Sequence, residues 1–281
     1  MTTGERRSIM IRTLALCLLC GCMPPSWGAS ALLHPARHEV AARPPLPFEE
    51  VAIETDGLTL RGWLFRTSAP RRGIMVYLHG VSDNRWSGVG LAQRFVPQGW
   101  DVLVYDSRAH GQSDGTECTY GFYEKNDVSR WLDRYGEGRV VLFGASLGAA
   151  VALQAAAIDG RVRGVIAQST FSDLRTIAND RAPFFASKGQ VAEAIRQAEQ
   201  AGHFPADEVS PLKAAAQIHV PVLLLHGADD DETGPAHSQR VYAALAGPKK
   251  LFLVPGAGHN DVLSGPEAWV IIEAWLAALD N

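Results

Sequence analysis

Six short apolar runs, rich in valine, isoleucine and leucine, alternate with longer segments whose apolar residues recur every three or four positions. Runs so uniformly apolar are typical of strands covered on both faces, as in a parallel sheet. They span residues 73–78, 100–105, 140–143, 164–167, 220–225 and 250–254. The helical spacing covers 89–95, 126–135, 147–158, 238–245 and 266–279. This alternation predicts repeated βα units and a mostly parallel sheet with helices on both faces.

A pair of alternating segments precedes these units. Residues 51–55 and 58–65 alternate apolar and polar side chains, and Asp56-Gly57 between them is a typical hairpin turn. The sequence therefore predicts an N-terminal antiparallel hairpin. Because 47% of the 281 residues are hydrophobic, the chain can bury a large core and is not a disordered protein. One α/β domain over 48–281 is compatible with this length.

The charge composition excludes one class of partner. The chain carries 26 basic and 30 acidic side chains, a net charge of -4. A domain that binds nucleic acid usually has a strongly basic surface, so we expect no nucleic-acid partner. The sequence gives no indication of an oligomeric state.

The first 21 residues have the pattern of an export signal. Three arginines precede a short apolar stretch over 13–21, and a basic lead followed by ~7–15 apolar residues is typical of a secretory signal peptide. Residues 19–22, Leu-Cys-Gly-Cys, resemble a bacterial lipobox with Cys22 as the lipid acceptor, although Cys20 replaces the usual small residue. The Ala-Ser-Ala sequence at 29–31 offers an alternative site for ordinary signal cleavage.

The two processing sites predict different locations. Lipidation of Cys22 predicts a lipoprotein that faces the periplasm and touches the membrane only through its lipid anchor. Cleavage at 29–31 predicts a soluble periplasmic or secreted protein. Residues 22–47 hold six of the 16 prolines, and this spacing predicts an extended tether without a helix. Cys118 is expected to be an inert thiol packed in the interior.

A strained serine is predicted at the turn after the run 140–143. There the chain reads Gly-Ala-Ser-Leu-Gly over 144–148 and continues into an alanine-rich helical pattern. A G-x-S-x-G sequence between a strand and a helix holds its serine on a tight turn that exposes the hydroxyl. The following helix N-terminus favours developing negative charge. Ser146 is the predicted nucleophile.

A serine hydroxyl needs a base to take its proton, and that base needs an anion to hold its tautomer. His259 directly follows the last apolar run, in the sequence Gly-Ala-Gly-His. Asp229, Asp230 and Asp231 follow the preceding run, and chemistry alone leaves the choice among them open. Because ligands bind at the carboxyl ends of the strands in open α/β sheets, we expect Ser146, His259 and one of these acids to meet at one sheet edge.

Five short sequence motifs, in their order along the chain, resemble those of the α/β-hydrolase superfamily. They resemble in particular those of small bacterial serine hydrolases similar to serine aminopeptidases and carboxylesterases. The motifs are Leu-His-Gly at 78–80, Asp-Ser-Arg-Ala-His-Gly-Gln-Ser at 106–113, Gly-Ala-Ser-Leu-Gly at 144–148, Pro-Val-Leu-Leu-Leu-His-Gly at 221–227 and Gly-Ala-Gly-His at 256–259. The resemblance covers about 51–279 and implies the α/β-hydrolase fold, with no metal and no cofactor. It implies Asp230 as the acid, four residues after the histidine of the His-Gly pair. The Gly-Pro at 234–235 departs from the usual place of proline after this loop.

Acyl transfer also needs two N–H donors for the oxyanion. The amide of Leu147, the residue after the nucleophile, is one expected donor. The His-Gly-x pattern of the family implies the amide of Val81 as the second, and the alternative is that His79 and Gly80 form a plain turn. His110 is expected to be structural.

The segment 170–210 is longer than a simple crossover needs, and it predicts a short helical cap. It contains Pro-Phe-Phe at 183–185 and an amphipathic stretch over 191–198. We expect Phe184 and Phe185 to line an apolar acyl pocket over the serine; the alternative is a helical excursion packed on the sheet. An apolar pocket favours esters over peptides with charged ends.

These features predict a serine hydrolase that cleaves a small ester, amide or thioester through an acyl-enzyme on Ser146. Cofactor-free haloperoxidases and C–C bond hydrolases use a similar triad and are the first alternative. A binding lipoprotein on a hydrolase fold, without catalysis, is the second. The expected partner is a small-molecule acyl substrate.

Overall fold

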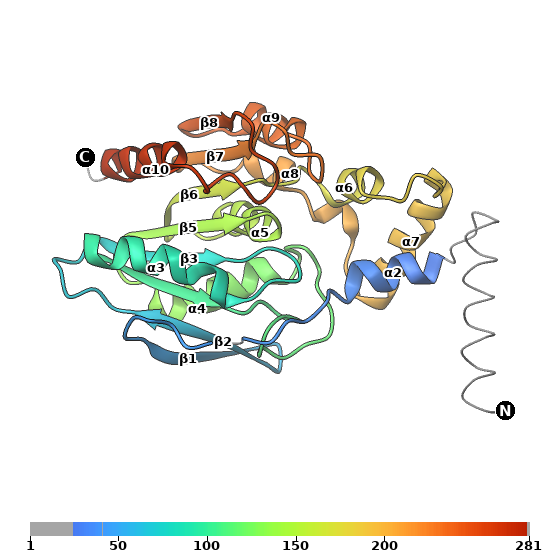
Figure 1. The fold of residues 1–281 in the computed structure, drawn as a ribbon. Coiled ribbons are helices and arrows are strands. Elements are labelled where there is room, and N and C mark those ends of the chain that lie inside the picture. The colour runs from blue at the N-terminus through green and yellow to red at the C-terminus, as the bar shows by residue number, and fades with distance from the viewer. Residues whose placement is uncertain (1–24, 41, 280–281) are drawn as a thin grey trace.

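The computed structural model describes residues 25–40 and 42–279 of the chain. Eight strands form one sheet in the order β1-β2-β4-β3-β5-β6-β7-β8 (Figure 1). Strands β1 and β2 are antiparallel to each other, and β2 is antiparallel to β4. All later neighbours in the sheet are parallel. The predicted fold class, a mostly parallel α/β sheet with an N-terminal hairpin, is confirmed.

The strands coincide closely with the predicted runs. Their bounds are β1 Glu49–Thr55, β2 Leu58–Phe65, β3 Gly73–Leu78, β4 Trp100–Tyr105, β5 Val140–Ala145, β6 Val162–Gln168, β7 Val222–Gly227 and β8 Lys249–Val254. Every residue of β3 and β4 is buried. Burial on both faces is the reason why these central strands are uniformly apolar.

Helices cover both faces of the sheet. Helices α3 (Val89–Phe95) and α10 (Pro266–Ala278) pack on one face. On the other lie α4 (Glu124–Tyr135), α5 (Leu147–Ala156), α8 (Pro211–Ala215) and α9 (Ala236–Ala244). Short 3-10 turns η1 (Arg85–Gly88) and η2 (Val96–Gln98) flank α3. The hydrophobic core is therefore split by the sheet into two clusters.

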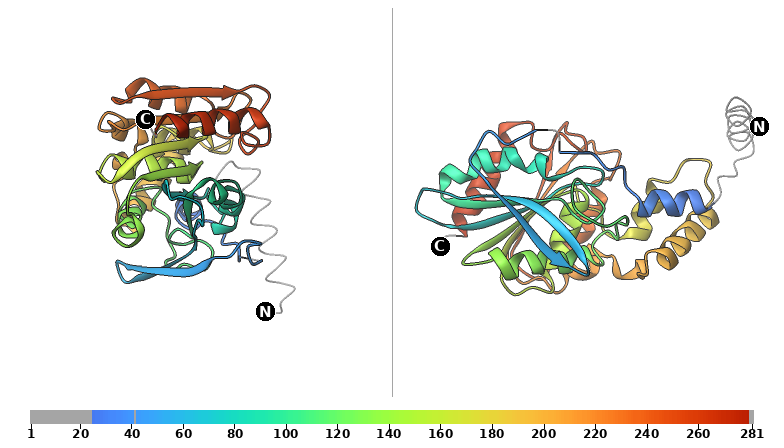
Figure 2. Two further views of the ribbon diagram at one scale, coloured as in Figure 1. Left: turned by 90° about the vertical axis from the view of Figure 1, so that its left-hand side faces the viewer. Right: turned by 90° about the horizontal axis from the view of Figure 1, so that it is seen from below.

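The segment between β6 and β7 forms the cap. It contains α6 (Leu174–Asp180), α7 (Lys188–Ala201) and the 3-10 turn η3 (Ala206–Glu208). Helix α7 begins with a capping box, in which the Ser187 hydroxyl accepts from the Gln190 amide and the Gln190 side chain accepts from the Ser187 amide. Figure 2 shows α7 beyond one end of the sheet, away from the central strands.

The prediction of an extended tether over 22–47 is wrong for its central part. Residues Pro25–Leu33 form a helix, α2, that packs along α7 (Figure 2). Proline is tolerated at the first turn of a helix, and the remaining prolines lie before Pro25 or after Leu33. The stretch 26–34 is therefore free of proline and can continue as a helix. The described part of the chain is therefore already folded at Pro25–Leu33, ahead of the predicted start at Phe48.

Of the two predicted processing sites at the N-terminus, only one lies among the described residues. The signal segment 1–21 and Cys22 lie outside the described residues. The alternative processing sequence, 29–31, lies inside α2, where Ala29 is buried. Within the part of the chain that the structure describes, no helix has the length and apolar character needed to cross a membrane.

Leu33 tests whether α2 is part of the folded domain. Its side chain is only 2% exposed and lies next to Gly202, at the end of α7. Substitution Leu33→Ala removes buried methyl groups and should lower the free energy of unfolding by about 2–4 kcal/mol. Urea unfolding of the full-length chain measures this, with Ser30→Ala on the exposed face of α2 as the matched control. Equal stability of both variants would show that α2 contributes no packing.

Candidate active site

Ser146 occupies a strained turn between β5 and α5. Its backbone has φ 51° and ψ -112°, a conformation that non-glycine residues rarely adopt. Such strain costs about 1–3 kcal/mol and persists only where the surrounding structure enforces it. Here the Ser146 N–H donates to the Gln168 carbonyl at 2.8 Å. The turn leaves the serine half-buried at the carboxyl end of β5.

The glycines on either side make this turn possible. A Cβ at Gly144 would lie 2.2 Å from the Gly148 carbonyl oxygen, and a Cβ at Gly148 would lie 2.0 Å from the Leu78 carbonyl oxygen. These distances are far shorter than any van der Waals contact. Only glycine therefore allows α5 to start so close to β3 and β5, which is the reason expected for the G-x-S-x-G spacing.

The structure brings Ser146, His259 and Asp230 together in one hydrogen-bonded series. Ser146 Oγ lies 2.9 Å from His259 Nε2, and His259 Nδ1 lies 2.7 Å from Asp230 Oδ2. Because a carboxylate only accepts, Nδ1 carries the proton and Nε2 is free to accept from the serine hydroxyl. The three residues follow β5, β8 and β7, so they meet at the sheet edge predicted from the sequence.

Asp230 is the acid of the three adjacent candidates that reaches the histidine. Its side chain is buried, whereas Asp229 and Asp231 are exposed. The second carboxylate oxygen of Asp230 accepts from the amides of Glu232 at 3.0 Å and Thr233 at 2.8 Å. These amides fix the carboxylate, so its other oxygen faces His259.

A second histidine contacts the same carboxylate. His226 is fully buried, and its Nε2 lies 3.1 Å from Asp230 Oδ2 and 2.6 Å from the Thr233 carbonyl oxygen. Its Nδ1 lies 2.6 Å from Ser238 Oγ. His226 belongs to the family motif at 221–227, but the sequence predicts no role for it. Only its position four residues before Asp230 could have indicated this contact.

These contacts decide the charge of Asp230. Burial raises the pKa of a carboxyl, but the hydrogen bonds from His226, His259 and the Thr233 amide outweigh burial and lower the pKa of Asp230 below its usual value. The carboxylate is thus ionised throughout the neutral range. It can hold the tautomer of His259 and stabilise a positive charge on its ring.

The two residues predicted to supply oxyanion donors lie at the cavity that Ser146 lines. Leu147 is the first residue of α5, so its N–H has no acceptor within the helix. Val81 follows Gly80, and both Val81 and Leu147 line the same cavity as Ser146. Val81 and Leu147, whose amides are the predicted oxyanion donors, thus line one cavity with the predicted nucleophile.

His79 is more than part of a plain turn. Its Nε2 lies 3.0 Å from the Ser107 amide, which can only donate, so the ring proton sits on Nδ1. Nδ1 in turn donates to the Gly80 carbonyl at 2.7 Å. Burial lowers the pKa of His79, which favours this neutral form. Because the Val81 N–H is trans to the Gly80 carbonyl, the bond fixes the direction of that N–H.

Two other singled-out residues lie apart from the hydrogen-bonded series. His110 is buried, and its Nδ1 lies 2.8 Å from the Arg108 carbonyl oxygen. Burial, with a smaller contribution from His79, lowers the pKa of His110 to about 4, so it stays neutral at physiological pH. Cys118 is fully buried, and burial raises its thiol pKa well above the usual value. Both side chains are thus packed in the interior, as predicted for residues with a structural role.

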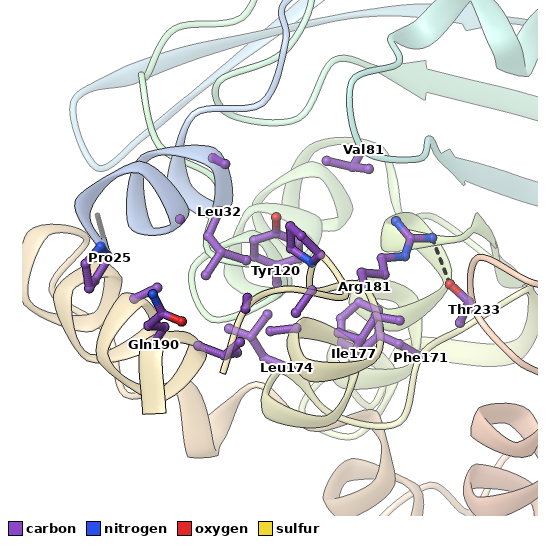
Figure 3. A pocket seen from close by; sticks show the side chains of 18 of the residues that line it. Pro25, Leu32, Val81, Tyr120, Phe171, Leu174, Ile177, Arg181, Gln190 and Thr233 are labelled. Carbon is purple, nitrogen blue, oxygen red and sulfur yellow. Dashed lines mark hydrogen bonds between the residues drawn. The ribbon is translucent and has the colours of Figure 1, made fainter. Parts of the chain in front are cut away.

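A cavity of about 300 Å³ opens beside Ser146 and extends beneath the cap (Figure 3). Phe185 lines it, but Phe184 points fully into solvent and takes no part in the lining. The prediction that both phenylalanines face the pocket is therefore wrong for Phe184. The two rings are adjacent in sequence and packed edge to face, so one can turn inward while the other turns outward. Among the residues described, no group of three His, Cys, Asp or Glu side chains could hold a metal ion.

The pKa shift of Asp230 makes stability depend on pH. A carboxyl whose pKa is lowered by folding stabilises the protein above its unfolded pKa of ~3.9, and this contribution disappears as the pH falls through the folded value. Asp230→Asn should therefore be less stable than the natural protein by about 1–3 kcal/mol at pH 7, and the difference should shrink below about pH 4.

Urea unfolding at pH 7, 4 and 2.5 measures this difference, with the exposed neighbour variant Asp229→Asn as control. A difference that stays constant down to pH 2.5 would contradict the assigned charge of Asp230.

Comparisons with known proteins agree with the observed fold. A sequence model of the family described as "alpha/beta hydrolase fold" matches residues 73–191. Protein YqkD of Bacillus subtilis is 30% identical over 206 residues, which span 66% of this chain and 64% of YqkD. Protein YfhR of Escherichia coli K12 is 28% identical over 233 residues, which span 78% of this chain and 77% of YfhR.

Among solved structures, the esterase Pf2001 of Pyrococcus furiosus superposes with a TM-score of 0.68 at 23% sequence identity. The superposition covers 87% of this chain and 97% of the esterase. At this identity, the likeness concerns the fold. The strand order, the strained serine turn and the match of residues 73–191 to the family model lead to one assignment: the chain has the α/β-hydrolase fold.

Proposed function

We propose that this protein is a serine hydrolase that cleaves carboxylic esters through an acyl-enzyme on Ser146. The observation that carries the proposal is the unbroken series from Ser146 Oγ through His259 to Asp230, with contacts of 2.9 and 2.7 Å. The esterase Pf2001, which shares the fold, supports esters as the substrate class.

The contacts suggest how the proton moves. His259 Nε2 accepts the hydroxyl proton while Ser146 Oγ attacks the carbonyl carbon and forms a C–O bond. The protonated ring then returns the proton to the alcohol oxygen, and the bond between carbonyl carbon and alcohol oxygen breaks. Water enters and gives a proton to His259 while its oxygen bonds to the acyl carbon. The bond between that carbon and Ser146 Oγ then breaks, and His259 returns the proton to Oγ. The released products are a carboxylic acid and an alcohol.

Charge on the carbonyl oxygen develops next to the start of α5. The proposed donors are the amides of Leu147 and Val81, which line the cavity beside Ser146, and the helix N-terminus adds a positive dipole end. The loss of one such donor costs about 10²–10³ in kcat. Asp230 meanwhile stabilises the imidazolium that forms on His259.

Ser146→Ala tests the nucleophile. The variant lacks the attacking oxygen and should lose at least about 10⁴-fold in kcat on p-nitrophenyl acetate. A fluorophosphonate probe should label the natural protein once, on the peptide that contains Ser146, and should not label the variant. Ser264→Ala, an exposed serine in the loop after His259, is the matched control and should keep both labelling and activity. Full labelling of Ser146→Ala would refute the assignment.

His79 is proposed as a positioning residue for the Val81 amide. His79→Ala removes the donor to the Gly80 carbonyl and should lower kcat by about 10- to 100-fold with little change in KM, because the oxyanion forms only during reaction. Asn at this position keeps a donor near the place of Nδ1, so His79→Asn should recover part of kcat. Steady-state kinetics of both variants measure this. Equal losses in both, or a loss confined to KM, would contradict the positioning role.

A further inference from the structure

The cavity beside Ser146 has a wall that lies outside the matched hydrolase segment. The family model begins at residue 73, whereas α2 contributes Pro25, Gly28, Ala31 and Leu32 to the lining. The opposite walls come from the cap helices α6 and α7. Figure 3 shows Leu32 extending from α2 toward Tyr120, across the space from Leu174 and Ile177. A segment that precedes the β-sheet thus bounds the pocket.

Helix α2 is held firmly in this place. A Cβ at Gly28 would lie 2.9 Å from the Cβ of Ala194, so the two helices touch at small residues. At the end of α2, the Leu33 carbonyl accepts from the Cys118 amide at 2.8 Å. Further along, Arg37 donates to the carbonyls of Ser113 and Gly115, both at 2.6 Å. The loop between β4 and α4 therefore fixes the wall.

The cavity is apolar along its length. It extends from Thr233, in the loop that carries Asp230, to Pro25 and Gln190 at the other end (Figure 3). Arg181 is the one charged side chain among the described lining residues, and it donates to the Glu232 carbonyl and the Thr233 hydroxyl at 3.0 and 2.8 Å. Its charge is thus turned toward polar partners, and the remaining space suits a hydrocarbon chain. The volume is at the lower end of the ~300–1,000 Å³ usual for small-molecule sites.

The position of His259 indicates which part of an ester enters. In the proposed reaction His259 protonates the departing alcohol, so the alcohol must lie next to its ring. The cavity is lined by Ser146 and by Val81 and Leu147, the residues whose amides are the proposed oxyanion donors, but His259 is not part of the lining. The acyl group, on the side away from His259, is therefore the part that enters the cavity.

We propose that α2 is a specificity-determining wall of an acyl-chain pocket, and that the substrates are esters of unbranched aliphatic acids whose chain length α2 and α7 limit. This inference rests on the proposed esterase function and adds the substrate class. Each methylene that moves from water into the cavity should raise kcat/KM by up to about fourfold, until the chain reaches the far end near Pro25 and Gln190.

The experiment compares the full-length protein with Leu32→Trp on p-nitrophenyl esters from acetate to dodecanoate. The tryptophan fills the space under α2, so kcat/KM for the preferred long ester should fall by about tenfold or more, while acetate changes less than about twofold. Leu32→Ala enlarges the pocket and should shift the preferred length upward. Ser30→Trp places the same ring on the exposed face of α2 and should keep the natural profile.

Two outcomes would overturn the inference and leave the esterase function intact. If Leu32→Trp hydrolyses all esters with the natural length profile, or loses activity on all of them equally, α2 does not limit the chain. A parallel series of acetate esters with longer alcohols should show little dependence on length. If the dependence appears there instead, the alcohol occupies the cavity. Failure of the proposed esterase mechanism would give a different result: the Ser146→Ala variant would still hydrolyse the acetate ester.

Discussion

The close approach of three backbone segments at the start of α5 determines the rest of the site. Gly144 and Gly148 have no space for a side chain because the Gly148 and Leu78 carbonyls lie where their Cβ atoms would be. This contact forces Ser146 into its positive-φ conformation and directs the hydroxyl away from the sheet. It also brings the loop after β3, with Val81, to the same place. The positions of the proposed nucleophile and of its proposed oxyanion donors are therefore consequences of one packing constraint.

The acid is held by a second, polar constraint. A buried carboxylate is unfavourable unless donors surround it, and Asp230 has both histidines and two backbone amides within reach. The same donors that keep Asp230 ionised also fix its direction toward His259. Burial and hydrogen bonding thus have opposite effects on the pKa of Asp230, but together they hold its carboxylate in one position. A group that orients the base must be held in this way.

The sequence predicted the strands well because both faces of the central sheet are buried, so their apolar runs have no competing explanation. Ser146 and His259 were predictable because each lies in a distinctive sequence motif directly after a strand. Asp230 was not separable by chemistry from Asp229 and Asp231, since their different exposure depends on how the turn folds. Helix α2 was missed because proline count was weighed without proline position, and Phe184 was misplaced because adjacent residues can point to opposite sides.

A crystal structure of the protein inhibited by a phosphonate with a decyl chain tests the central claim most directly. We expect phosphorus bonded to Ser146 Oγ and a phosphoryl oxygen about 2.7–3.1 Å from the amide nitrogens of Leu147 and Val81. We also expect the alkyl chain to lie under α2. Phosphorus on another residue, or a phosphoryl oxygen directed away from both amides, would contradict it.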